Sequence, residues 1–242
     1  MPLFIFISGY FSKNVTQPRF KDVENLLYPY IVIQLLYLLA YKIAGVNAYW
    51  SIALPIGPNW YLLALFFYRL VIPYFKYLKF PVAMSLVISL AIGYFYEFDK
   101  FLNIQRIIAF MPYFVLAYFI PSSFKNVVTN KHYKIYSMIA IVLTLLLFML
   151  IAYFVPQIDK LMGGTYIPNI GYSLLEEYAP LGVFFRLFSF VSSFAISCLF
   201  LNLVPVTKTW FSGMGNRTLY IFLFHMFAVY IISLFVHYKP VI

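Results

Sequence analysis

Three arginines lie inside long apolar runs of this sequence, where a charged side chain is energetically costly and usually functional, and two of them share a depth. Arg106 stands about one turn inside the run from Ile104 to Ile120, and Arg186 has a similar place in the run from Leu181 to Val204. Two guanidinium groups at one depth could hold an anionic group, or polarise an oxygen on which charge develops in a transfer reaction. The alternative is structural: the arginines extend to the membrane surface, or they pair with acidic residues of the neighbouring links, namely Glu97, Asp99, Glu176 and Glu177.

A histidine in the last apolar run is the third candidate. His225 lies near the middle of the run from Arg217 to Tyr238. A neutral imidazole can move a proton or form a hydrogen bond between helices, and both roles stay open for His225. Arg69, in the run from Asn59 to Phe75, lies nearer the opposite side of the membrane, where we expect a structural role. The candidate catalytic residues are therefore Arg106, Arg186 and His225.

The composition shows what must position these side chains. The chain has 242 residues, of which 64% are hydrophobic and 10% charged, whereas soluble domains are about half apolar and a quarter charged. Apolar runs of membrane length recur without the alternation of β-barrel strands, which predicts an all-α, polytopic transmembrane helix bundle. The net charge of +10 comes from basic residues scattered singly between these runs, which argues against nucleic-acid binding.

Motifs for cofactors and metals are absent from the sequence. There is no phosphate loop, zinc-ligand spacing, nucleophile elbow or dinucleotide fingerprint. The single cysteine, Cys198, lies in an apolar run, so no disulfide framework or cysteine-based metal site is available. We expect no metal and no tightly bound cofactor.

The apolar runs predict about seven or eight hydrophobic segments in a single integral-membrane domain covering residues 1–242. Trp60 and Tyr61 fit an aromatic belt at the membrane boundary. The polar segment from Pro156 to Pro180 is predicted to be a loop, and the link before the second segment is predicted to run from Ser12 to Asn25. The predicted segments are Met1–Phe11, Leu26–Ala44, Asn59–Phe75, Phe80–Tyr96, Ile104–Ile120, Tyr133–Val155, Leu181–Val204 and Arg217–Tyr238.

The distribution of charge between these segments predicts their orientation, because cytoplasmic links hold the excess of lysine and arginine. Most of the basic residues fall in alternate links, and most of the acidic residues fall in the others. This places the first link in the cytoplasm and the C-terminus outside a cell membrane. The basic links hold Lys13, Arg19, Lys21, Lys76, Lys79, Lys125, Lys131, Lys134, Lys208 and Arg217.

The first segment is unusual, because Met1 to Phe11 reaches only ~16 Å of a ~30 Å hydrocarbon core. The charge pattern also starts it on the outer side, and no signal-peptide features accompany it. We therefore expect the domain to be incomplete at its N-terminus, with at least one span ahead of Met1.

Four stretches of the chain resemble a known family. MPLFIFISGYF at Met1–Phe11, WYLLALFFYRLV at Trp60–Val71, RIIAFMPYFVLAYF at Arg106–Phe119 and MGNRTLYIFLFH at Met214–His225 are similar to the acyltransferase-3 family of integral-membrane O-acyltransferases. The fucose 4-O-acetylase-like branch is the most similar. Ala117 stands where relatives usually show glycine, a departure that we expect to alter only helix packing.

The resemblance implies transfer of an acyl group, commonly acetyl, from acyl-CoA to a hydroxyl of an envelope or extracellular sugar. Arg106 and Arg186 match the family's recurrent arginines, and His225 matches the histidine of the final motif. The family's leading catalytic histidine belongs to a span ahead of the Met-Pro-Leu-Phe motif, so we expect residues 1–242 alone to have little activity. The partners implied are the lipid bilayer, acyl-CoA and a sugar or polysaccharide acceptor.

Two alternatives stay open from the sequence. Prolines and arginines inside the membrane would also suit a transporter or flippase of an envelope glycan intermediate, although the two halves of the chain show no repeat. A non-catalytic remnant of an acyltransferase is the other.

Overall fold

The computed structural model describes residues 1–15, 19–43, 51–95, 102–154, 171–172, 179–205, 207, 213, 215, 218, 221–225 and 227–229. This part of the chain is helical and holds no strand, so the all-α prediction is confirmed. The α-helices are α1 (Pro2–Phe11), α2 (Phe20–Asp22), α3 (Tyr28–Ile43), α4 (Trp60–Phe75), α5 (Pro81–Ala91), α6 (Ile104–Phe119), α7 (Phe124–Val128), α8 (Lys134–Phe154) and α10 (Gly182–Leu203).

Among the described residues, three continuous helical stretches are long and apolar enough to cross a membrane by themselves. They are Phe20–Ile43, Phe124–Ile151 and Ala179–Leu203. Shorter apolar helices cover Pro2–Phe11, Pro81–Tyr94 and Ile104–Phe119. The chain is thus a membrane helix bundle, and the number of seven or eight spans stays a prediction.

Three helices begin and end within a residue or two of the predicted segments 104–120, 133–155 and 181–204, and α4 matches the segment 59–75 equally well. The fourth segment is shorter than predicted, because α5 ends at Ala91 and a 3-10 turn, Ile92–Tyr94, follows it. The predicted loop 156–180 and last segment 217–238 lie mostly outside the described residues, and within the latter 221–225 and 227–229 are helical.

The predicted link from Ser12 to Asn25 is wrong in its second half. The chain is helical from Phe20, and a π-helical stretch, Val23–Leu27, joins α2 to α3. A charge near the start of this helix is tolerated because the Asp22 carboxylate accepts a hydrogen bond from the Arg69 guanidinium of α4 at 2.7 Å. The helix therefore continues through this polar stretch, because Asp22 has a charged partner on α4.

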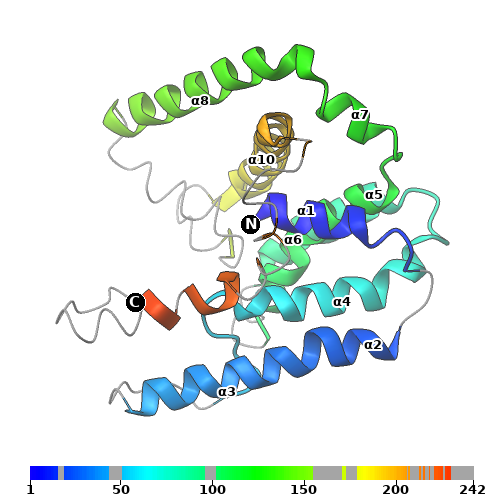
Figure 1. The fold of residues 1–242 in the computed structure, drawn as a ribbon, viewed down its shortest axis with the longest axis vertical. Helices are drawn as coiled ribbons and strands as arrows, with labels where there is room; N and C mark the ends of the chain where they lie inside the picture. The colour runs from blue at the N-terminus through cyan, green and yellow to red at the C-terminus, as the bar shows by residue number, and fades with distance from the viewer. Residues whose placement is uncertain are drawn as a thin grey trace.

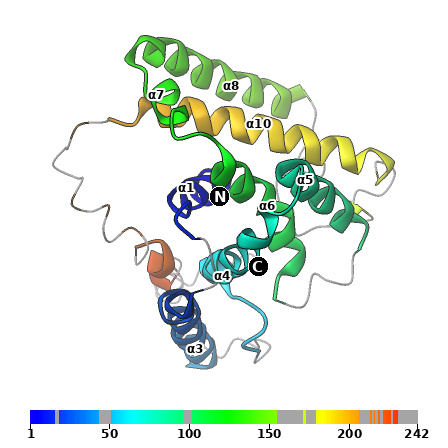
Figure 2. The ribbon, with the colours of Figure 1, turned by 90° about the vertical axis from the view of Figure 1, so that its right-hand side faces the viewer.

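The helices form three layers (Figures 1 and 2). α8 and α10 lie side by side in one outer layer, α1, α5 and α6 form the middle layer, and α3 and α4 form the other outer layer. The middle layer therefore contacts both others. A site at the ends of its helices would be enclosed by neighbouring helices on both sides.

Close packing of α1 on α6 depends on two small residues. A Cβ atom on Gly9 would lie 2.4 Å from the Phe114 carbonyl oxygen and 3.0 Å from the Ala117 methyl group. Ala117 is fully buried at this contact. Ala117 thus lies at the contact between the two helices, where Gly9 leaves room for its methyl group. That the departure from glycine alters only helix packing stays a prediction.

Trp60 and Tyr61 correct the sequence analysis. They are only 2% and 7% exposed, so they belong to the core and not to an aromatic belt at the membrane boundary. The Trp60 ring stacks on Phe110 of α6 with centroids 5.4 Å apart, and the Tyr61 hydroxyl lies 2.6 Å from Ser8 Oγ of α1. Both aromatic side chains are turned inward because α1 and α6 cover the first turn of α4.

A buried amide pair fixes where α4 begins. The Gln34 side chain of α3 donates to the Leu54 carbonyl at 2.6 Å and accepts from the Ile56 N–H at 3.1 Å. Its oxygen also accepts from the Asn59 amide at 2.9 Å. Since buried polar groups need such partners, this network ties the connection 51–59 to α3 and places Trp60 at the start of α4.

Candidate functional site

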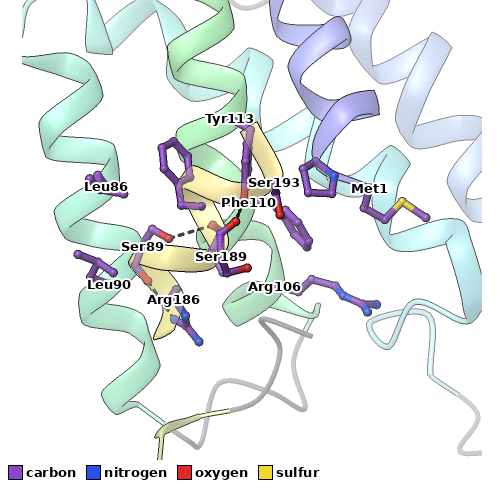
Figure 3. A pocket seen from close by; sticks show the side chains of 13 residues that line it. Met1, Leu86, Ser89, Leu90, Arg106, Phe110, Tyr113, Arg186, Ser189 and Ser193 are labelled. Atoms are coloured by element: carbon purple, nitrogen blue, oxygen red, sulfur yellow. Dashed lines mark hydrogen bonds between the residues drawn. The ribbon is translucent and has the colours of Figure 1, made fainter. Parts of the chain in front are cut away.

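A cavity of about 190 Å³ opens where the ends of α1, α5, α6 and α10 meet. Figure 3 shows its lining, with the Arg106 and Arg186 side chains at one edge of the group. The two arginines that the sequence singled out thus line one cavity. The lining residues are Met1, Pro2, Leu86, Ser89, Leu90, Arg106, Ala109, Phe110, Tyr113, Arg186, Ser189, Phe190 and Ser193.

Arg106 is positioned by the start of α6. Leu102 and Asn103, directly before the helix, have positive φ angles of 55° and 51°, an uncommon conformation for residues other than glycine. The Leu102 N–H donates to the Ala53 carbonyl at 2.7 Å, which anchors this sharp entry to the connection before α4. In the first turn that follows, the Arg106 guanidinium lies over the Trp60 ring, 4.7 Å from its centroid, in a cation–π contact.

Arg186 lies in the second turn of α10 and is 6% exposed. Its guanidinium donates to the Ser89 carbonyl of α5 at 3.0 Å. The Ser89 hydroxyl in turn donates to the Ala109 carbonyl of α6 at 2.9 Å, so one residue links all three helices. A hydrogen bond from a charged donor is stronger than one between neutral groups, which suits a fixed position for this side chain.

Tyr172 is a site residue that the sequence analysis missed. It belongs to the polar segment predicted to be a loop, yet it is 4% exposed, and the Arg186 guanidinium lies 4.7 Å from its ring centroid. Burial raises the pKa of the Tyr172 phenol, and the nearby Arg186 charge opposes that rise. No periodicity marks an isolated tyrosine in such a segment, so its place could be found only from the structure.

Hydroxyl groups complete the polar part of the cavity. Ser189 and Ser193 follow Arg186 on one face of α10, at the three- and four-residue spacing of helical neighbours. The Tyr113 hydroxyl of α6 donates to the Ser189 carbonyl at 3.4 Å, and its ring packs on Phe190 with centroids 4.6 Å apart. This mixture of hydroxyls and aromatic rings is suited to binding a polyol over an apolar surface.

The electrostatics of the cavity favour negative charge. α6 and α10 begin beside it, and their aligned peptide dipoles place partial positive charge there. α5 ends beside it, but the Ser89 and Leu90 carbonyls at that end accept hydrogen bonds from Arg186 and Tyr172. The two guanidinium groups add to the same potential. Such an arrangement can stabilise an oxyanion that forms during acyl transfer.

None of the described lining residues is a histidine or a carboxylate. The described side chains of the cavity suit the binding and polarisation of reactants.

His225 does not line this cavity. It is exposed on the helical stretch 221–225, where its Nδ1 lies 2.5 Å from the Phe222 carbonyl. Because a carbonyl oxygen can only accept, a hydrogen bond at this contact has Nδ1 as its donor. The Tyr37 hydroxyl donates to the Leu223 carbonyl at 2.9 Å and holds this stretch against α3. A catalytic role for His225 stays a prediction.

Arg69 pairs with Asp22 across the bundle, which agrees with the structural role expected for it; that role stays a prediction. The alternative ion-pair partners of Arg106 and Arg186, namely Glu97, Asp99, Glu176 and Glu177, lie outside the described residues.

A second cavity, of about 320 Å³, lies at the opposite ends of α1 and α10. Its walls are mainly apolar and include Phe11, Phe124 and Leu201, with Lys125 among the lining residues. Between the two cavities the Phe6 and Phe194 rings meet edge to face with centroids 5.4 Å apart. The bundle thus offers an electropositive cavity at one end and an apolar cavity beside the basic links at the other.

The family model Acyl_transf_3, described as "Acyltransferase domain", matches residues 1–241. No curated protein and no solved structure matches the chain.

Proposed function

From the premise that the chain belongs to the acyltransferase-3 family, we propose that it transfers an acyl group, most simply acetyl, from acyl-CoA to a sugar hydroxyl. Its family and its apolar helices make it a membrane acyltransferase of the non-aminoacyl kind. The observation that carries the finer proposal is the single cavity that holds both Arg106 and Arg186 among hydroxyl and aromatic side chains.

The reaction joins the acceptor oxygen to the donor's carbonyl carbon. The sugar hydroxyl attacks the thioester carbon, its proton passes to a base, and the carbon–sulfur bond breaks to release CoA as a thiolate that is then protonated. Negative charge gathers on the carbonyl oxygen as the attack proceeds. In this proposal Arg106 and Arg186, which line one cavity, stabilise that charge, and such stabilisation is commonly the largest electrostatic contribution to these reactions.

The base is proposed to be the family's histidine from a span ahead of the Met-Pro-Leu-Phe motif. Met1 and Pro2 line the cavity, so a segment joined to Met1 would enter the site there. We accordingly expect little transfer by residues 1–242 alone and restoration by an in-frame upstream span that carries a histidine. Full activity of the 242-residue chain, abolished by His225→Gln, would instead assign the base to His225.

The two cavities suggest how the substrates are divided between the membrane faces. Acyl-CoA carries phosphates and is cytoplasmic, so the apolar cavity beside Lys125 is a suitable entrance for the donor. The acceptor, a sugar of the envelope or cell exterior, then reaches the arginine cavity from the outer side. This orientation puts the C-terminus outside the cell membrane.

The orientation can be tested with a membrane-impermeant maleimide in a Cys198→Ala background. Lys42 and Lys125 are both exposed and lie on opposite predicted sides. Lys42→Cys should be labelled in intact cells and Lys125→Cys only in inverted vesicles. The reverse pattern would overturn the proposed orientation.

The transfer itself is tested with labelled acetyl-CoA in membranes that contain the protein, extended by the upstream span. Label should enter a glycan, and Arg106→Gln or Arg186→Gln should each lower the rate by about 100- to 1,000-fold, as for loss of one oxyanion donor. Arg19→Gln is the matched control, because Arg19 is exposed, donates to the Asn14 carbonyl and does not line the cavity. Movement of a lipid-linked glycan without acetylation would favour the transporter alternative, and inactivity with the span supplied would favour a remnant.

A further inference from the structure

Tyr172 is held by glycines from two different elements, one near each end of its ring. A Cβ atom on Gly93, in the turn after α5, would lie 2.4 Å from the Tyr172 Cζ atom. A Cβ atom on Gly182, the first residue of α10, would lie 2.4 Å from the ring's Cδ1 atom. The ring therefore fits a slot that only residues without side chains leave open.

The edge of the ring is fixed as well. The Tyr172 hydroxyl donates to the Leu90 carbonyl at 2.9 Å, and Tyr94 packs against the ring edge to face with centroids 4.9 Å apart. These contacts are directional, so they fix the orientation of the ring as well as burying it. They set the plane of the ring relative to α5 and α10.

The Arg186 guanidinium lies over that ring and is anchored to the same turn of α5. Tyr172 donates to the Leu90 carbonyl and Arg186 to the Ser89 carbonyl, which is the adjacent peptide group. The last carbonyls of a helix lack full intrahelical pairing and carry partial negative charge, so they suit both donors. The ring and the Ser89 carbonyl together restrict the directions that the guanidinium can take.

We propose that Tyr172 is a positioning residue that directs the Arg186 guanidinium into the cavity. Tyr172, which the sequence places in a predicted loop, thereby lies against Arg186, and Arg186 itself lines the cavity. The expected effect on kcat rests on the proposed acyl transfer. The expected orientation of the Arg186 guanidinium does not.

Arginine modification tests the positioning without any need for acyl transfer. The rate at which phenylglyoxal modifies Arg186 would be measured by mass spectrometry, relative to exposed Arg19 in the same sample. Tyr172→Leu, which removes the ring face, should raise this ratio several-fold, whereas Tyr172→Phe should change it little. An unchanged ratio in a folded Tyr172→Leu protein would overturn the proposal.

Kinetics supply the second readout. A cation–π contact of this kind is worth about 2- to 30-fold in rate if it is lost where the charge acts. Tyr172→Leu should lower kcat by that factor with the KM for acetyl-CoA nearly unchanged, and Tyr172→Phe should retain most of the rate. An equal loss in both variants, or a loss in KM only, would contradict positioning through the ring.

Gly93→Ala tests whether the slot acts through the ring. The added methyl group would meet the Cζ and Cε atoms of Tyr172, so it should displace the ring and lower kcat in the wild-type background but have little further effect in the Tyr172→Leu background, where leucine lacks those atoms. Fully additive losses would mean that Gly93 acts independently. If the parent protein transfers no acyl group, the proposed function fails, while the modification experiment still decides the role of Tyr172.

Discussion

Replacing Gly9 with alanine adds one methyl group at the closest approach of α1 to α6. The new Cβ would lie 2.4 Å from the Phe114 carbonyl oxygen, well inside van der Waals contact. A backbone oxygen in a helix cannot turn aside, so one helix must shift away from the other. α1 also supplies Pro2 to the arginine cavity, so this shift would widen the site.

The magnitude follows from the cost of overpacking, which is typically about 1–3 kcal/mol. For a protein of this length, each kilocalorie lowers the unfolding temperature by about 2–4 °C. We therefore expect Gly9→Ala to lower Tm by about 2–12 °C, and to reduce acyl transfer at temperatures where the protein is still folded.

Thermal unfolding in detergent, followed by intrinsic tryptophan fluorescence, measures the shift. Gly213→Ala is the matched control, because a Cβ atom there would meet nothing within 4 Å. The double variant Gly9→Ala with Ala117→Gly should recover only part of the loss. It removes the 3.0 Å contact between methyl groups but leaves the Phe114 carbonyl in place.

Two results would refute this reasoning. Equal Tm values for Gly9→Ala and Gly213→Ala would mean that α1 and α6 are farther apart than described. Complete rescue by Ala117→Gly would mean that the methyl contact, and not the carbonyl oxygen, sets the spacing.

Three further predictions concern charged and aromatic residues. Asp22→Asn should destabilise the protein by about 1–3 kcal/mol, seen as a lower Tm, because Arg69 keeps its charge and loses its carboxylate partner; an unchanged Tm would show that the pair is solvated. Trp60→Leu should lower kcat about 2- to 30-fold by removing the ring under Arg106, with Trp60→Phe retaining more of the rate, and equal effects would exclude the cation–π contact. The raised pKa of Tyr172 means that the folded protein favours the neutral phenol. Its contribution to stability is therefore complete at pH values below the usual phenol pKa and is lost as the pH rises through the folded pKa. Tyr172→Phe should reduce this loss of Tm at alkaline pH.

Helix positions were largely predictable because they depend on local composition. The limits of α4, α6, α8 and α10 follow apolar runs bounded by prolines, charges or polar turns, and each run contains its own signal. Arg106 and Arg186 could also be paired from the sequence, because each lies shortly after a run begins on the same predicted side. The structure places both at one cavity.

Features that depend on partners distant in sequence were not predictable. The helix that begins at Phe20 is accompanied by an ion pair between Asp22 and Arg69 across the bundle. By its place in the sequence Trp60 fits a membrane boundary, but in the fold Phe110 and Arg106 pack against its ring. Tyr172 carries no local pattern at all.

The amino-acid sequence by itself determined the class of the protein, because the transfer of apolar segments into a membrane is decided residue by residue along the chain. It also determined which charged side chains such segments must accommodate. Only the tertiary structure decided which of them meet. Directional contacts, such as the two guanidinium groups over Trp60 and Tyr172, exist only once helices far apart in sequence have packed together.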